Sequence, residues 1–188
     1  MKELPQRKPN RLQGYDYSQN GAYFVTICTK DRSELFCAIT PTAITPIVGA
    51  VGNRPLDRPP YPKLTTIGEI IENEILIMKK IRNNVSVDQY IIMPNHIHMI
   101  IVIHNNGDGN GWLNGGENGR LPTAPTLQTI IRLWKRAISK RIGFSPWQKS
   151  FHERIIRDDE EYTRIAEYIQ NNPARWQEDR FYQEGTNT

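Results

Sequence analysis

Two apolar runs on either side of a Pro-Asn corner constrain the fold of this chain more than any other feature. They lie within residues 90–103, which read YIIMPNHIHMIIVI. Apolar runs of this length around a turn dipeptide predict two buried strands joined by a tight turn. Successive side chains of a strand point to opposite faces, so His96 and His98 are expected on one face and Ile97 on the other.

The histidine pair has two interpretations. Two imidazoles at neighbouring positions on the same face of a strand can both reach one metal ion. The alternative is a pair of hydrogen-bonded histidines at the start of a strand. The pair alone does not decide between a metal site and a structural contact.

Composition is that of a globular protein. The chain has 188 residues, of which 38% are apolar and 23% charged, enough for one domain with a sizeable core. The net charge of +4 is a mild excess that is compatible with a nucleic-acid partner. Cys28 and Cys37 lack the spacing of a disulfide framework or a metal motif. We expect a cytoplasmic protein with no membrane partner, because no apolar run approaches ~20 residues and no signal-peptide core is present.

The periodicity of apolar residues predicts seven elements. Strands are expected at residues 22–29, 85–93, 96–103 and 150–157. Helices are expected between Thr66 and Asn83, between Thr126 and Gly143, and between Asp158 and Asn172. The first of these helices is expected to begin with a capping box formed by Thr66 and Glu69. This order of elements is that of a ferredoxin-like α+β sandwich, an antiparallel sheet with helices packed on it, extended by a C-terminal helix.

Two segments do not fit the regular pattern. Residues 39–64 contain six prolines, and residues 104–122 are rich in glycine and asparagine. Both are expected to be irregular insertions. With these insertions, residues 1–188 are interpreted as a single domain.

Basic residues gather at three places that could contact DNA. The helix after Thr126 carries five cations on its outer face: Arg132, Lys135, Arg136, Lys140 and Arg141. The first 20 residues form a basic arm with aromatic residues, in which Arg11 could contact phosphates and Tyr15 and Tyr17 could stack on bases. Arg154, in the last strand, is a further candidate contact. The alternative for each group is an ordinary solvated surface.

Tyr168 and Asn172 are four residues apart in the last predicted helix, so their side chains share one helix face. A tyrosine phenol can act as a covalent nucleophile, and an amide oxygen can bind a metal ion. Taken alone, such a pair near a helix end is usually packing combined with a cap.

Several motifs together resemble a known family. They are HIH after MPN, the segments SPWQKSFHERIIRDDEEY and EYIQNNPARW, and the opening GYDYSQNGAYFVTICT. In combination they strongly resemble the REP-associated tyrosine transposases, which belong to the single-tyrosine HUH transposases that act on single-stranded DNA. The resemblance covers most of the chain except residues 39–64 and 104–122.

The resemblance implies a role for four residues. His96 and His98, with Ile97 between them, match the HUH motif, and together with Asn172 they would hold a divalent metal. Tyr168 matches the nucleophile, which would attack a DNA phosphodiester to form a 5′-phosphotyrosine link. The implied activity is transposase-like cleavage and rejoining of single-stranded DNA at hairpin (REP-type palindromic) sequences. Two imidazoles and one amide oxygen suit Mg²⁺ or Mn²⁺, and a monomer is expected rather than a homodimer.

Two other functions remain open at this stage. A ferredoxin-like sheet can bind single-stranded nucleic acid without catalysis, in which case binding would survive the loss of Tyr168 and of the metal. Alternatively, His96 and His98 could activate water in a metal-dependent phosphodiester hydrolase, which would not need Tyr168.

Overall fold

The structure is a computed structural model that describes residues 14–40, 59–81, 84–104 and 126–183. Its centre is a four-stranded antiparallel sheet with the spatial order β4-β5-β1-β6. The strands are β1 (Gly21–Cys28), β4 (Val85–Ile92), β5 (His96–Ile103) and β6 (His152–Ile156). Helix α1 (Thr66–Ile81) connects β1 to β4, and α2 (Leu127–Ile142) connects β5 to β6. This topology confirms the predicted ferredoxin-like α+β fold.

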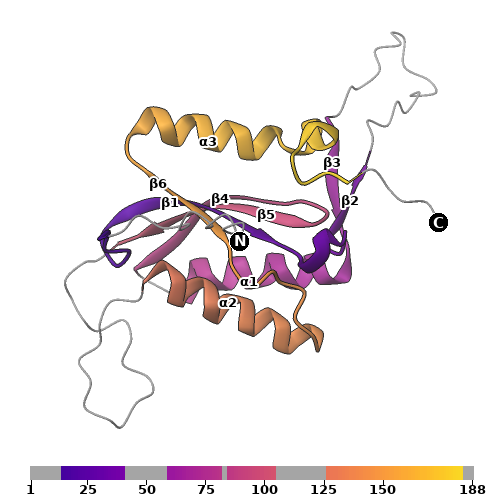
Figure 1. The fold of residues 1–188 in the computed structure, drawn as a ribbon, viewed down its shortest axis with the longest axis horizontal. Coiled ribbons are helices and arrows are strands. Elements are labelled where there is room, and N and C mark those ends of the chain that lie inside the picture. Colours follow the sequence, from indigo (N-terminus) through magenta and orange to yellow (C-terminus); the bar gives the residue numbers. More distant parts are fainter. Residues whose placement is uncertain (1–13, 41–58, 82–83, 105–125, 184–188) are drawn as a thin grey trace, which may run out of the picture.

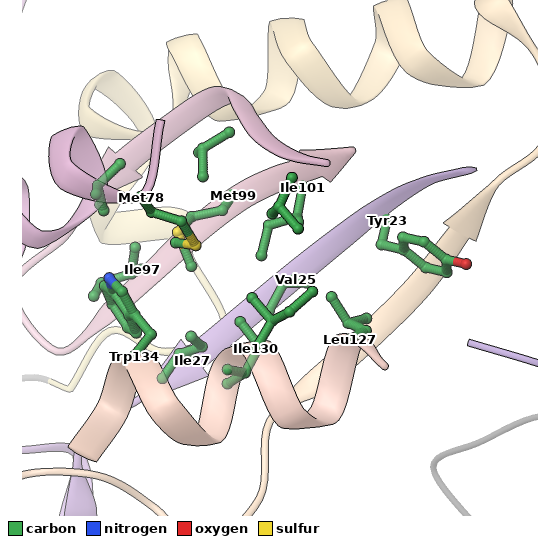
Figure 2. Packing of buried hydrophobic residues seen from close by; sticks show 14 of the residues in the cluster. Tyr23, Val25, Ile27, Met78, Ile97, Met99, Ile101, Leu127, Ile130 and Trp134 are labelled. Atoms are coloured by element: carbon green, nitrogen blue, oxygen red, sulfur yellow. The ribbon is translucent and has the colours of Figure 1, made fainter. Parts of the chain in front are cut away.

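The helices cover both faces of the sheet. Helices α1 and α2 lie on one face, and α3 (Asp159–Asn171) lies across the other (Figure 1). The core between the sheet and the first two helices is built from alternate residues of β1 and β5 together with helix side chains, as Figure 2 shows. Labelled members of this core are Tyr23, Val25, Ile27, Met78, Ile97, Met99, Ile101, Leu127, Ile130 and Trp134.

Helix α3 closes the opposite face with a smaller core. Ile169 of α3 packs with Ile100 of β5 and Ile156 of β6, and all three are buried. Because both faces of β5 are covered, residues 99–103 of the strand form a continuous apolar run and do not alternate between apolar and polar residues. The two histidines occupy the first two positions of β5 that face α3.

The predicted helix ends are confirmed at α2 and α3 and corrected at α1. The Thr126 side chain accepts a hydrogen bond from the Thr129 amide, and Gly143 ends α2 with a φ of 85°. At α1 the cap is Thr65 and not Thr66, because the Thr65 hydroxyl accepts from the Gly68 amide at 3.2 Å. Thr65 Oγ1 also donates to the Leu35 carbonyl at 2.7 Å, so a long-range contact selects the cap.

The predicted insertion at residues 39–64 has regular structure at both ends. Strand β2 (Cys37–Thr40) pairs antiparallel with β3 (Tyr61–Leu64), so the prediction of an irregular segment was wrong there. The prolines around Pro62 obscured this short two-stranded sheet in the sequence. Residues 41–58, and nearly all of the second predicted insertion, lie outside the described residues. A membrane-spanning helix, which must be both long and apolar, is absent from the described part of the chain.

Candidate functional site

The two histidines lie together on the face of the sheet that α3 covers. In the β1–β5 ladder, Cys28 is opposite His96 and Thr26 is opposite His98. The Nε2 atoms of the two imidazoles are 3.0 Å apart. His96 is 0% and His98 1% exposed. The predicted same-face arrangement is therefore present, and the two ring nitrogens point at one another inside the protein.

Each imidazole is held through its other nitrogen. His96 Nδ1 lies 3.0 Å from Asn95 Oδ1, and His98 Nδ1 lies 2.9 Å from Thr26 Oγ1. Phe24 of β1 stacks on the His98 ring at a centroid distance of 5.2 Å. These contacts leave both Nε2 atoms directed toward a common point. Partners of this kind orient metal-binding histidines in proteins.

Helix α3 brings the predicted nucleophile to the histidines. Tyr168 Oη lies 3.2 Å from His98 Nε2 and donates to Asp179 Oδ2 at 3.3 Å. The Tyr168 side chain is 42% exposed, so one end of the phenol contacts the buried pair while the rest can meet a large substrate. The i, i+4 spacing places Asn172 beside it, and Asn172 Nδ2 donates to the same Asp179 oxygen at 3.1 Å.

Asp179 is a site residue that the sequence analysis missed. It follows the 3-10 helix η2 (Pro173–Glu178), which returns the chain toward the histidines after Pro173 ends α3. Its Oδ1 accepts from the Phe181 amide at 2.7 Å, which fixes the carboxylate. One carboxylate oxygen and one ring nitrogen from each of His96 and His98 lie within 4.8 Å of one another. A lone aspartate in a polar segment carries no spacing signal, so only the fold identifies it.

Burial sets the protonation of the site. It lowers the pKa of His96 to about 3, with the nearby Arg180 and Arg32 contributing. Burial and then His96 itself hold the pKa of His98 well below its usual value. Burial, followed by the Asp179 carboxylate, raises the pKa of Tyr168. At neutral pH the site therefore contains two neutral imidazoles, which can bind a metal, and a protonated phenol.

The side chains present fit a divalent metal ion. Two nitrogens at ~2.1 Å from one ion and at right angles to each other would be ~3.0 Å apart, and the Nε2 atoms are 3.0 Å apart. Asn172 is 3% exposed, yet its Oδ1 has no hydrogen-bond partner among the described residues. A buried oxygen of this kind usually has a partner. Imidazole, amide and carboxylate donors together suit Mg²⁺ or Mn²⁺.

A pocket of about 500 Å³ opens beside Tyr168, Asn172 and Asp179. Three arginines line it, Arg164, Arg175 and Arg180, together with the acidic Glu167 and Glu178. The arginines come from α3 and from the segment that follows it. None of them was among the predicted DNA contacts.

Helix α2, which carries four of the predicted DNA contacts, lies on the opposite face of the sheet from α3, the helix that contains Tyr168 (Figure 1). Arg132, Arg136 and Lys140 are exposed there. The Lys135 ammonium donates to the Gln148 and Ser150 carbonyls at 3.1 and 3.0 Å, so it holds the loop before β6 in place.

The other predicted DNA contacts differ in how exposed they are. Arg154 is exposed but forms an ion pair with the buried Glu161. Tyr17 is 7% exposed and belongs to the core, so the structure contradicts its predicted role in base stacking. Tyr15 packs edge-on against it at a centroid distance of 4.9 Å and is only partly buried. Arg11 lies outside the described residues.

Comparisons with known proteins give a relative in sequence and a neighbour in fold. The chain is 31% identical over 189 residues to an uncharacterised protein of Haemophilus influenzae, a match that covers 94% of this chain and 93% of that protein. No protein-family model matches the sequence. Among solved structures, a REP-associated tyrosine transposase bound to a REP hairpin superposes with a TM-score of 0.52 and 18% identity, covering 94% of this chain and 74% of that chain. This likeness is one of fold.

The partly buried ammonium of Lys135 should make the stability of the folded protein depend on pH. Burial lowers the pKa of its ammonium from the ordinary 10.5 to about 8. Between these values the unfolded chain binds more protons than the folded one, so this residue makes the free energy of unfolding rise with pH. The substitution Lys135→Met removes that rise. We expect the stability difference, variant minus wild type, to decrease steadily from pH 7.5 to pH 9.5 in urea titrations. A pH-independent difference would contradict the assignment.

Proposed function

We propose that this chain, which belongs to the same family as the Haemophilus influenzae protein and has the fold of a REP-associated tyrosine transposase, is a metal-dependent enzyme that cleaves and rejoins single-stranded DNA. One observation carries the proposal: the Tyr168 phenol lies 3.2 Å from Nε2 of a buried, neutral histidine pair. A half-exposed tyrosine in contact with candidate metal ligands is in the right place for a covalent nucleophile.

The proposed step forms one phosphoester bond for each one that it breaks. Tyr168 Oη attacks a DNA phosphorus atom, the bond from phosphorus to the 3′ oxygen breaks, and the chain keeps a 5′-phosphotyrosine link. The leaving strand takes up a proton and ends in a 3′-OH. Attack by a second strand's 3′-OH on the phosphotyrosine reverses these changes and joins two DNA ends. No water is consumed, so cleavage and strand transfer are one reaction run in two directions.

Each residue of the site has its own role in the proposed reaction. His96, His98 and Asn172 would hold the divalent ion, and Asp179 lies where it could be a further ligand. The bound ion would supply positive charge that stabilises the phosphate in the transition state. Because the Tyr168 phenol donates to Asp179 Oδ2, the carboxylate also lies on the path by which the phenolic proton leaves. The sheet and α3 bury both imidazoles.

The substrate is inferred from the structural neighbour and from the pocket. The neighbour is a transposase bound to a REP hairpin. We infer that this chain also acts on hairpin DNA with a short single-stranded flank. Arg164, Arg175 and Arg180 surround the pocket at Tyr168, where flanking phosphates would lie.

The nucleophile is tested with hairpin DNAs from the sequence that flanks the gene, in the presence of Mg²⁺ or Mn²⁺. We expect wild-type protein to form a covalent protein–DNA adduct that survives denaturation, and Tyr168→Phe to form none, because phenylalanine has no oxygen to attack with. The matched control is Tyr162→Phe, six residues earlier on α3, whose hydroxyl donates to Asp88 at 3.4 Å. This control should form adduct at the wild-type level. Cleavage that persists in Tyr168→Phe would favour a hydrolase.

The metal centre is tested by calorimetric titration with Mn²⁺ in the absence of DNA. We expect Asp179→Asn to weaken Mn²⁺ binding by about tenfold or more, because a charged donor beside the ion is lost. The neighbouring Glu178→Gln is the control, since its carboxylate is exposed and pairs with Arg175 at 3.0 Å. Equal affinities for the two variants would exclude Asp179 from the metal site.

Two basic surfaces can be compared by the salt dependence of DNA binding. Each phosphate contact adds ~0.7 to the slope of log K against log salt for single strands. We expect Arg164→Ala, at the pocket, to lower that slope by about this amount, whereas Arg136→Ala, on the far face of the sheet, should leave it unchanged. The opposite result would place the DNA over α2, as the sequence suggested.

A further inference from the structure

We propose that Asn95 fixes the tautomer of His96, whereas Thr26 allows His98 to exchange one tautomer for the other when a metal ion binds. The inference rests on the proposed metal site and concerns the hydrogen-bond chain behind it. Asn95 and Thr26 are positioning residues that act through the imidazoles.

The orientation of the Asn95 amide is determined by its surroundings. Its Nδ2 donates to the Phe181 carbonyl at 2.8 Å and to the Arg32 carbonyl at 3.2 Å. Two carbonyl acceptors require the NH₂ end of the amide, so Oδ1 must be the atom that faces His96 Nδ1. An amide oxygen only accepts hydrogen bonds. His96 therefore carries its proton on Nδ1, and His96 Nε2 presents a lone pair.

The neighbours of His98 Nε2 then determine its state in the absence of a metal. One neighbour, His96 Nε2 at 3.0 Å, is an acceptor for the reason just given. The other, Tyr168 Oη at 3.2 Å, already directs its hydrogen to Asp179, so it also offers a lone pair. Two acceptors around one nitrogen require that His98 Nε2 carries the proton. His98 Nδ1 is then an acceptor, and the Thr26 hydroxyl donates to it.

A metal ion at the site needs the lone pairs of both Nε2 atoms. His96 already presents one. His98 must lose the proton on Nε2 and gain one on Nδ1 by exchange with water, so the imidazole stays neutral and no net proton is released. Thr26 keeps the free-energy cost of this exchange low, because its hydroxyl can rotate and change from a donor to an acceptor toward Nδ1. The amide of Asn95 has no such freedom.

The chain is well suited to a direct measurement, since it has only four histidines. Protein labelled with ¹⁵N in histidine, without DNA, is studied by long-range proton–nitrogen correlation before and after addition of Mg²⁺. Without metal we expect His96 protonated on Nδ1 and His98 on Nε2. With Mg²⁺ at saturation, both should be protonated on Nδ1. His96 protonated on Nε2, or a His98 tautomer that does not respond to bound Mg²⁺, would overturn the proposal.

Substitutions distinguish the role of Asn95 from the role of Thr26. Asn95→Ala should populate the Nε2–H form of His96 and weaken Mn²⁺ binding by about 10- to 100-fold. Asn95→Asp keeps an acceptor toward His96 and should keep its Nδ1–H form. Thr26→Val, nearly the same shape, should leave His96 unchanged and weaken Mn²⁺ binding. Asn84→Asp is the control and should change neither quantity, because Asn84 precedes β4 and its carbonyl bonds to the His104 amide, at the end of the β4–β5 pair away from the site.

The tautomer test is independent of the DNA chemistry. If Asn95→Ala does not fold, the wild-type spectra alone decide the assignment. If the wild-type tautomers are as expected but no DNA adduct forms, the proposed reaction is wrong and the hydrogen-bond chain is right. If an adduct forms while the tautomers differ, the reaction stands and the roles of Asn95 and Thr26 are wrong.

Discussion

The antiparallel pairing of β1 with β5 is the constraint on which the rest of the structure depends. Its register sets Thr26 opposite His98 and Cys28 opposite His96. Because side chains alternate along a strand, a slip of one residue would turn both histidines into the core beneath α1 and α2 and bring Ile97 to the site. The buried core residues Ile97, Met99 and Ile101 of β5 prevent such a slip, since they would then face α3. Core packing thus positions the candidate metal ligands.

The second requirement is that the C-terminal part of the chain returns to the sheet. Helix α3 supplies Tyr168 and Asn172, and the segment after it supplies Asp179 and Phe181. Asn95 connects this segment to the Pro-Asn corner through the Phe181 carbonyl, at 2.8 Å. Phe181 in turn packs on His96 at a centroid distance of 4.6 Å. Burial by these elements keeps the imidazoles neutral, which is the form that binds metal.

The sequence predicted the parts of this structure that depend on local patterns. Strand alternation placed His96 and His98 on one face, and the helix starts at Thr126 and Asp158 and the helix end at Gly143 were predicted from neighbouring residues. The sequence did not predict the features that depend on contacts between residues far apart in the chain. Asp179 is recruited by the fold, Tyr17 is buried by packing against Tyr23, and Thr65 is selected as a cap with the help of Leu35. The sequence showed the basic residues of α2, but it did not show that α2 lies on the opposite face of the sheet from the site.

A crystal of the protein soaked in Mn²⁺ would show, in an anomalous difference map, whether the histidine pair binds a metal ion. We expect one strong peak in contact with Nε2 of both His96 and His98, and with Asn172 Oδ1 or the Asp179 carboxylate, beside the Tyr168 hydroxyl. The absence of a peak there, with the histidines still hydrogen-bonded to each other at a saturating Mn²⁺ concentration, would contradict it. The pair would then be structural, and the fold would be used without metal chemistry.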